Sequence, residues 1–222
     1  MSADIHNAGA NDGAPFLPLG ADICVRRGAW LPHWASGNGT YAVTFRLGDS
    51  LPQTVLRSWE DERNDIRDTV RRQGRKPTPS EVRRMEKLRS AKIQAYLDAG
   101  RGACHFRDAS IAECLAETLR RFDGSRYSLY AWVIMPNHVH VIVGPMPPRT
   151  LPEILHSWKS YTAKFANKRL GRSGTFWQAE YYDHLIRNAE EFSHGVLYIR
   201  ENPAKAGLRD WPWVWVRGEE KT

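Results

Sequence analysis

Two histidines, His138 and His140, stand one residue apart in the apolar stretch Met135-Pro-Asn-His-Val-His-Val-Ile-Val. Successive side chains of a β-strand point to opposite faces, so the two imidazoles share one face, about 7 Å apart. One divalent ion above that face can take a nitrogen atom from each ring. For an isolated pair of this kind, two exposed or core histidines are the commoner arrangement. A metal site therefore requires further groups from elsewhere in the chain.

A second group of reactive side chains lies in the helix predicted at about 190–201. The apolar stripe of this helix consists of Phe192, Val196 and Ile199. Tyr198 falls about 120° away from that stripe, and Asn202 follows one turn later beside it. The phenol and the amide are therefore placed to reach one shared ligand. A tyrosine at the edge of the core, with an asparagine that caps the helix, explains the same spacing.

The elements that must position these residues alternate between strand and helix. Helices are predicted at about 109–122, 151–169 and 190–201, the last ending because Asn202 precedes Pro203. Strands are predicted at 40–47, 127–135 and 138–143, with an extended segment at 175–186. This order is the split βαβ pattern. It predicts an α+β fold with a ferredoxin-like or RRM-like antiparallel sheet and helices on one face.

The length and composition suit a single packed domain. The chain has 222 residues, of which 41% are hydrophobic and 11% aromatic, enough for one sizeable core. We expect residues 1–22 to form a mobile N-terminal arm and residues 23–222 to form a single domain. This domain contains a charged helical insertion at about 58–100. No apolar run is long enough to span a bilayer, which argues against a membrane protein.

Cysteine usage and charge predict the compartment and the partner. Cys24, Cys104 and Cys114 form no C-x-x-C pair, which argues against a disulfide scaffold and favours a reducing cytoplasm. The net charge of +7 favours polyanionic partners such as nucleic acid.

Several motifs together resemble one family. They are Met135-Pro-Asn-His-Val-His140, Trp158-Lys-Ser160, Phe176-Trp-Gln178, Tyr182-Asp-His184 and Tyr198-Ile-Arg-Glu-Asn-Pro-Ala-Lys-Ala-Gly-Leu208. In this order they resemble the REP-associated tyrosine transposases, members of the HUH superfamily of single-tyrosine transposases. The resemblance runs from about residue 24 onward and is least informative in the charged region at about 59–99.

The resemblance implies a role for each site residue. His138 and His140 match the HUH pair that binds a divalent ion, and Asn202 matches the position that completes the metal site. Tyr198 matches the nucleophile that forms a 5′-phosphotyrosine with DNA. Mg²⁺ or Mn²⁺ is the expected cofactor, and His184 is expected to support the site from beside the ligands.

The resemblance also implies that single-stranded or hairpin DNA is the partner, at repetitive extragenic palindromes. The basic side chains expected to meet phosphates are Lys159, Lys164, Lys168, Arg169 and Arg172. A solvated helix face explains each of them equally well. The expected protein is a monomer or homodimer, without a membrane anchor, in a bacterial cytoplasm and associated with the nucleoid.

Two other functions fit parts of the sequence. The first is a domesticated hairpin-binding protein that has lost catalysis, although the complete set of His138, His140, Tyr198 and Asn202 argues against it. The second is a zinc hydrolase acting on small molecules, which would need an acidic general base that the sequence does not place beside the histidine pair.

Overall fold

The computed structural model describes residues 39–51 and 99–219, together with 24–27, 32–35, 68, 72–74, 78 and 95–97. The predicted N-terminal arm and most of the predicted insertion lie outside the described residues. Among the helices in these ranges, none combines the length and apolar character needed to cross a bilayer.

Five strands form one antiparallel sheet in the order β6-β3-β5-β4-β7. Their bounds are β3 Thr40–Arg46, β4 Tyr127–Ile134, β5 His138–Pro145, β6 Tyr182–Ile186 and β7 Val214–Val216. Strands β1 (Cys24–Arg27) and β2 (Pro32–Ala35) pair as a separate antiparallel hairpin. The first four strands of the larger sheet have the ferredoxin-like order, so the α+β class and the antiparallel sheet are confirmed.

Three long helices accompany the sheet, and the sequence explains where each begins. Helix α3 (Ala109–Arg120) starts where Asp108 accepts a hydrogen bond from the Ser110 N–H. Helix α4 (Leu151–Arg169) starts with a capping box formed by Thr150 and Glu153. Helix α5 (Ala189–Lys205) starts where Asn188 accepts from the Glu191 N–H. Each cap satisfies an amide that the helix itself leaves without a partner. A short 3₁₀ turn, η1 (His105–Arg107), precedes α3.

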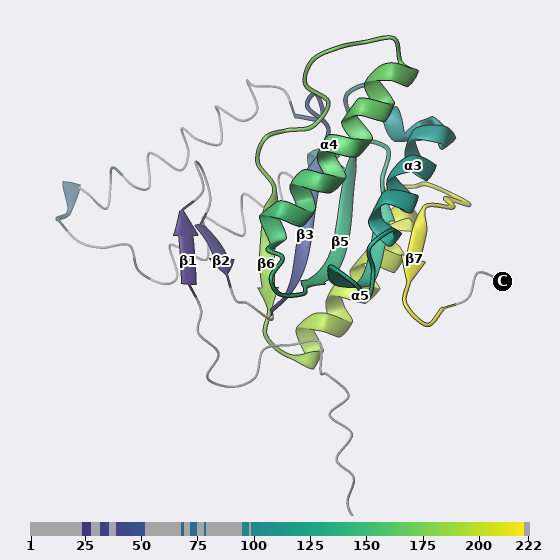
Figure 1. Cartoon of the computed structure of the whole chain (residues 1–222). Helices are drawn as coiled ribbons and strands as arrows, with labels where there is room; N and C mark the ends of the chain where they lie inside the picture. Colours follow the sequence, from purple (N-terminus) through teal and green to yellow (C-terminus); the bar gives the residue numbers. More distant parts are fainter. Residues whose placement is uncertain are drawn as a thin grey trace, which may run out of the picture.

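The helices lie on both faces of the sheet, so the expectation of helices on one face is wrong. Helices α3 and α4 pack with Phe45, Val139 and Val141 in the larger core. Helix α5 packs on the other face, where Ile199 lies with Val133 and Ile142 in a separate core. Figure 1 shows α3 and α4 on the near side of the sheet and α5 crossing behind it. The split βαβ pattern accounts for the two crossover helices, whereas α5 follows the last of its four strands and is free to cover the other side.

Helix α5 also continues further than predicted. Pro203 lies inside it, and the helix ends at Lys205 instead of before Asn202. Proline removes one backbone donor, but beyond it the N–H of Ala206 still bonds the Asn202 carbonyl and that of Leu208 the Pro203 carbonyl. Because the helix persists, Asn202 is a helical residue on the same flank as Tyr198.

Candidate active site

The two histidines of β5 face the α5 side of the sheet. In the register with β3, His138 pairs with Arg46 and His140 with Thr44. Both imidazoles are buried, with 0% and 5% of their surfaces exposed. Their Nε2 atoms lie 3.0 Å apart and their ring planes are inclined at 84°. Two imidazole nitrogens thus converge on one point, as the alternation of strand side chains predicts.

The outer nitrogen of each ring has its own partner. Nδ1 of His138 lies 2.7 Å from Oδ1 of Asn137, the residue before it. Nδ1 of His140 lies 2.7 Å from Oγ1 of Thr44, directly opposite on β3. Such outer hydrogen bonds fix the orientation of a metal-binding imidazole.

Burial keeps both imidazoles neutral at physiological pH. It lowers the pKa of His140 to about 3. Burial also lowers the pKa of His138 well below its usual value, and the neighbouring His140 and Arg46 lower it further. A neutral imidazole has a nitrogen lone pair to offer, which is the state that a metal ligand requires.

Helix α5 places Tyr198 above His140 by packing very closely on β5. A Cβ atom at Gly195 would lie only 3.0 Å from Cδ1 of Ile142, so the helix reaches this depth because residue 195 is glycine. One turn later the Tyr198 hydroxyl lies 3.4 Å from Nε2 of His140. The two rings meet edge to face at 82°, with their centroids 5.1 Å apart. The phenol thus reaches the point on which the two Nε2 atoms converge.

Asn202 continues the same line of residues along α5. Gly195 lies over Ile142 and Tyr198 over His140, and Asn202 follows one helical turn after Tyr198. Only 2% of Asn202 is exposed. Among the described residues, its Oδ1 atom is buried and accepts no hydrogen bond. A buried amide oxygen without a donor costs free energy, and a cation would remove that cost.

These donors fit a divalent cation held by two imidazoles and one amide oxygen. In the described part of the chain, no group of three or more His, Cys, Asp or Glu side chains could hold a metal ion. Among the described residues, a third ligand at the histidine pair would therefore be a neutral group such as the Asn202 amide. Imidazole nitrogen and amide oxygen donors suit several divalent ions, and a set of only three protein donors leaves coordination positions for substrate oxygens.

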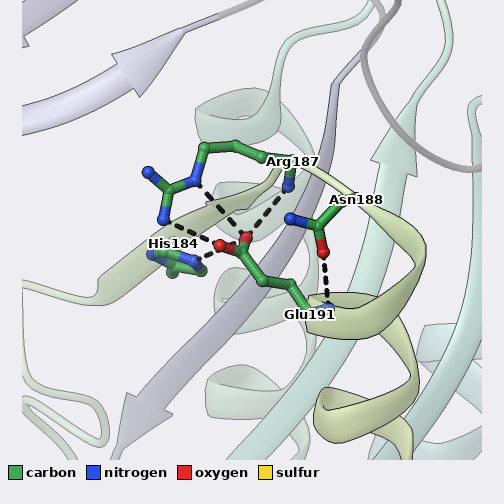
Figure 2. A network of polar contacts seen from close by, with 4 residues as sticks. All are labelled: His184, Arg187, Asn188 and Glu191. Atoms are coloured by element: carbon green, nitrogen blue, oxygen red, sulfur yellow. Dashed lines mark hydrogen bonds and ion pairs between the residues drawn. The ribbon is translucent and has the colours of Figure 1, made fainter.

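His184 lies on β6 and joins a different polar group, which Figure 2 shows. Its Nε2 lies 3.3 Å from Oε2 of Glu191. Arg187 binds the same carboxylate through its guanidinium at 2.7 Å, and Asn188 caps the helix beside it. The hydrogen-bond partner of His184 is therefore the Glu191 carboxylate at the start of α5. The expected support of the metal ligands by His184 stays a prediction.

The five basic residues expected to bind DNA differ in their surroundings. Lys159 is engaged by the fold, because its Nζ donates to the carbonyls of Gln178 and Ala179 at 2.6 and 2.9 Å. Burial lowers its pKa, an effect that Arg46 reinforces. Arg169 pairs with Asp108, and Arg172 binds His105 and the Thr175 carbonyl. Lys164 and Lys168 are exposed on α4 and make no ion pair with another described residue. The phosphate contacts expected of all five residues stay a prediction.

Two of the other sequence motifs hold the framework together. Trp158 donates from Nε1 to the Tyr127 hydroxyl at 3.1 Å. Trp177 donates from Nε1 to the Lys159 carbonyl at 3.0 Å, and Gln178 donates from Nε2 to the Gly48 carbonyl at 2.8 Å. The W-K-S and F-W-Q motifs thus join α4, the strand β3 and the segment before β6.

Three residues of the site were not expected from the sequence. Asn137 stands in the histidine motif without a role of its own, and nothing distinguishes Thr44 except its place in the strand predicted at 40–47. Lys205 lies one turn beyond Glu201, with its Nζ 5.9 Å from the centre of the Tyr198 ring. The signal for Lys205 was its spacing of seven residues from Tyr198, which is two turns of one helix face.

Comparison with known proteins identifies the class. Residues 105–202 match the family model described as "Transposase IS200 like". The matched part of the chain includes both histidines, Tyr198 and Asn202. The resemblance predicted from the motifs is therefore confirmed for this part of the chain.

Curated relatives give a narrower resemblance. A REP-associated tyrosine transposase of Escherichia coli strain K12 is 33% identical over 95 residues, which are 39% of this chain and 53% of the relative. A putative REP-associated tyrosine transposase of Haemophilus influenzae is 25% identical over 107 residues, covering 39% of this chain and 57% of the relative. The chain thus spans about half the length of the curated relatives that it matches.

Among solved structures, a REP-associated tyrosine transposase bound to a REP hairpin aligns with a TM-score of 0.46 at 18% identity. The alignment covers 85% of this chain and 82% of that one. A putative transposase from Deinococcus radiodurans aligns with a TM-score of 0.29 at 13% identity, covering 80% of this chain and 97% of that one.

Proposed function

We propose that this protein is a metal-dependent DNA strand transferase that cleaves single-stranded DNA beside hairpins of repetitive extragenic palindromes. Tyr198 is the nucleophile, and His138, His140 and Asn202 hold the divalent cation, Mg²⁺ or Mn²⁺. The family match over residues 105–202 and the names of both curated relatives support the transposase class and the palindromic target.

One observation carries the proposal. The Tyr198 hydroxyl lies 3.4 Å from Nε2 of His140, and that atom lies 3.0 Å from Nε2 of His138. A nucleophilic oxygen and two neutral nitrogen donors therefore share one buried point at the sheet surface. A tyrosine that only covered the edge of a core would have no need to bring its hydroxyl to this point.

The reaction requires a phenol to attack an anionic phosphodiester. The usual pKa of a phenol is near 10, so the hydroxyl is a weak nucleophile at neutral pH. A bound divalent cation polarises the phosphoryl oxygens and offsets the charge that develops in the transition state. His138, His140 and Asn202 would hold that cation, and Lys205, which pairs with Glu201 at 2.8 Å, lies on the same flank of α5 as Tyr198.

The transfer of the phosphoryl group conserves the energy of the bond. The Tyr198 oxygen forms a bond to the phosphorus, the bond from phosphorus to the 3′ oxygen breaks, and that oxygen leaves as a 3′-hydroxyl. The DNA strand is then held through a 5′-phosphotyrosine. Attack by another 3′-hydroxyl restores the phosphodiester and the free phenol, so no nucleotide cofactor is needed.

Tyr198 acts in its own chain under this proposal. Its hydroxyl already lies within 3.4 Å of a histidine of the same chain, so no exchange of α5 between two copies is required. A monomer is therefore sufficient for the first cleavage. Outside the site, Lys164 and Lys168 on α4 are the exposed cations that we assign to phosphate contacts.

The deciding experiment replaces Tyr198 by phenylalanine. The protein is incubated with a labelled single strand that carries a palindromic hairpin, in Mn²⁺ or Mg²⁺, and the covalent adduct is resolved on a denaturing gel. Wild-type protein is expected to form the adduct, whereas Tyr198→Phe is expected to bind the hairpin and form none. Tyr161→Phe is the matched control, because Tyr161 is an exposed tyrosine on α4, and it should react like wild type.

Each contrary result has a distinct meaning. An adduct that persists in Tyr198→Phe would assign the nucleophile to another residue. Hairpin binding by the wild-type protein without any cleavage in either metal ion would favour the non-catalytic hairpin-binding protein. Stoichiometric zinc in a protein without DNA affinity would favour a hydrolase.

A further inference from the structure

Asn137 is buried in the turn between β4 and β5, and its amide joins two parts of the molecule. None of its surface is exposed. Its Nδ2 donates to the carbonyl oxygens of Leu97 and Arg101, at 3.2 and 2.8 Å. Its Oδ1 lies 2.7 Å from Nδ1 of His138. The side chain thus lies between the end of the charged segment and one histidine of the site.

The chemistry of these partners leaves the amide a single orientation. Backbone carbonyl oxygens can only accept hydrogen bonds, so the NH₂ group of Asn137 must face Leu97 and Arg101. The amide oxygen must then face His138. Because that oxygen is only an acceptor, the hydrogen atom of this contact belongs to Nδ1 of His138.

The same reasoning fixes the other nitrogen of His138. A neutral imidazole carries one N–H group, so a hydrogen atom on Nδ1 leaves Nε2 with a bare lone pair. This lone pair points to Nε2 of His140, 3.0 Å away. His138 is thus held with a donor atom directed at the proposed cation position before any cation arrives.

We propose that Asn137 is a positioning residue that fixes His138 in its Nδ1–H tautomer, and that the backbone carbonyl groups of Leu97 and Arg101 fix Asn137 in turn. This inference rests on the proposed function, because His138 is a ligand only if the site holds a metal ion. The described end of the charged segment then helps to preset a metal ligand.

His140 differs from His138 in this respect. Its outer partner is the Thr44 hydroxyl, which can donate or accept. Without a cation, a contact of 3.0 Å between two ring nitrogens needs one hydrogen atom, and only Nε2 of His140 is left to carry it. If a cation bound to Nε2 of His140, the hydrogen atom would move from there to Nδ1 of the same ring, and the Thr44 hydroxyl would become the acceptor. His138 is preset, whereas His140 changes its tautomer.

The test reads the tautomers directly, without metal. The full-length protein is labelled with ¹⁵N at histidine, and long-range ¹H–¹⁵N correlation spectra are recorded in chelator at neutral pH. In wild-type protein, His138 is expected as the Nδ1–H tautomer. In Asn137→Ala the acceptor is lost, so His138 is expected to move its hydrogen atom to Nε2 in most molecules.

Metal affinity is the second measurement, with Mn²⁺ as the probe in calorimetry. Asn137→Ala is expected to bind Mn²⁺ about 10- to 100-fold more weakly, the usual effect of losing a hydrogen bond behind a ligand. The matched control is Asp49→Ala, which removes the 2.7 Å bond from the Ala103 N–H and loosens the same stretch of chain. It should leave the tautomer of His138 unchanged.

Two results would overturn the inference. One is a wild-type spectrum with His138 as the Nε2–H tautomer, a result that does not depend on whether any variant folds. The other is a folded Asn137→Ala protein in which the tautomer stays at Nδ1–H. If wild-type protein binds no Mn²⁺, the result contradicts the metal site of the proposed function. The spectra still decide whether Asn137 fixes the tautomer of His138.

Discussion

The two faces of the sheet are built from the same strands and differ in kind. On the face toward α3 and α4, β5 contributes Val139, Val141 and Val143 to a core without ionisable groups from that strand. On the face toward α5, the same strand contributes His138 and His140 before Ile142. The odd-numbered residues of β5 thus pack in the core and stabilise the fold, whereas His138 and His140 on its other face belong to the candidate site. The alternation of a β-strand makes this division possible without a separate active-site loop.

One polar pair beside α4 and one polar atom beside α5 differ in their partners, although the α4 side also buries Trp132 Nε1 and Thr162 Oγ1 without a hydrogen bond to a described residue. Toward α4, the Trp158 N–H meets the Tyr127 hydroxyl, which itself bonds the Leu119 carbonyl at 2.9 Å. Toward α5, the Asn202 amide oxygen is buried and accepts no hydrogen bond from the described residues. The first arrangement stabilises the fold, whereas the second keeps a donor atom ready for a ligand at some cost in stability.

Removal of a large side chain from the α4 face should have the largest effect. Phe45→Ala deletes a fully buried ring whose centroid lies 5.0 Å from that of Trp177. We expect the free energy of unfolding to fall by about 3–5 kcal/mol, measured by urea denaturation. If Phe45→Ala costs less than about 1 kcal/mol, the α4 face is not the main source of stability.

Thr44 precedes Phe45 on β3 and points to the α5 face. Its replacement should affect the affinity for Mn²⁺ and not the stability of the fold. Thr44→Val keeps the shape but removes the hydroxyl that meets His140. We expect Mn²⁺ affinity to fall about 10- to 100-fold in calorimetry. Stability should change by no more than about 1 kcal/mol.

The control for Thr44→Val is Thr118→Val. Thr118 is a buried threonine on α3 whose hydroxyl bonds the Cys114 carbonyl at 2.6 Å. It should not alter Mn²⁺ affinity. Equal losses of affinity in both variants would mean that the two faces are not separate in function.

Acid should weaken the fold in part through the buried histidines of the α5 face. The pKa of His140 is about 3 in the folded chain, so between pH 6.5 and 3 only the unfolded chain takes up this proton. Stability is therefore complete above pH 6.5 and falls as the pH decreases. For one such group the loss between pH 7 and 5 is about 2 kcal/mol.

This pH dependence is checked by denaturation in chelator across that range. His140→Asn should show a flatter dependence of unfolding free energy on pH than the wild type. Phe45→Leu, a change on the α4 face, should keep the wild-type slope. Identical slopes in all three proteins would exclude His140 as the source.

The smallest effect is expected at the close contact between α5 and β5. Gly195→Ala gains helix propensity but brings a Cβ to 3.0 Å from Cδ1 of Ile142, so the net change in stability should stay within about 1 kcal/mol. Ile142→Val removes that methyl group. In the Ile142→Val background, Gly195→Ala should therefore be more favourable than in wild type. Additive effects in this double-mutant cycle would show that the contact does not limit the approach of the helix.

Local patterns in the sequence predicted the elements better than their arrangement. The apolar spacing predicts a helix at 151–169, and α4 spans Leu151–Arg169. The predicted end of α5 before Asn202 was wrong. A proline near a helix end removes only one backbone hydrogen bond, and the packing of α5 against β4 and β5 offsets that loss. Which face of the sheet α5 covers depends on tertiary packing, and the order of the elements along the chain does not predict it.

The candidate site shows the same limit. The pairing of His138 with His140, and of Tyr198 with Asn202, follows from the periods of strand and helix. The role of Asn137 depends on carbonyl groups of residues 97 and 101, some forty positions away, which no local pattern relates to it. Lys159 appeared to be a surface cation because a helical stripe does not show which neighbouring loop covers its flank.

The charged segment leaves and rejoins the folded domain at nearly the same place. Leu51 and Leu97 are both buried, and Asp49 accepts a hydrogen bond from the Ala103 N–H. A stretch whose two ends meet can change in length at little entropic cost to the remaining fold. Evolution could therefore enlarge or exchange this stretch between lineages, and an engineer could graft another module there, provided that the anchoring residues at both ends are kept.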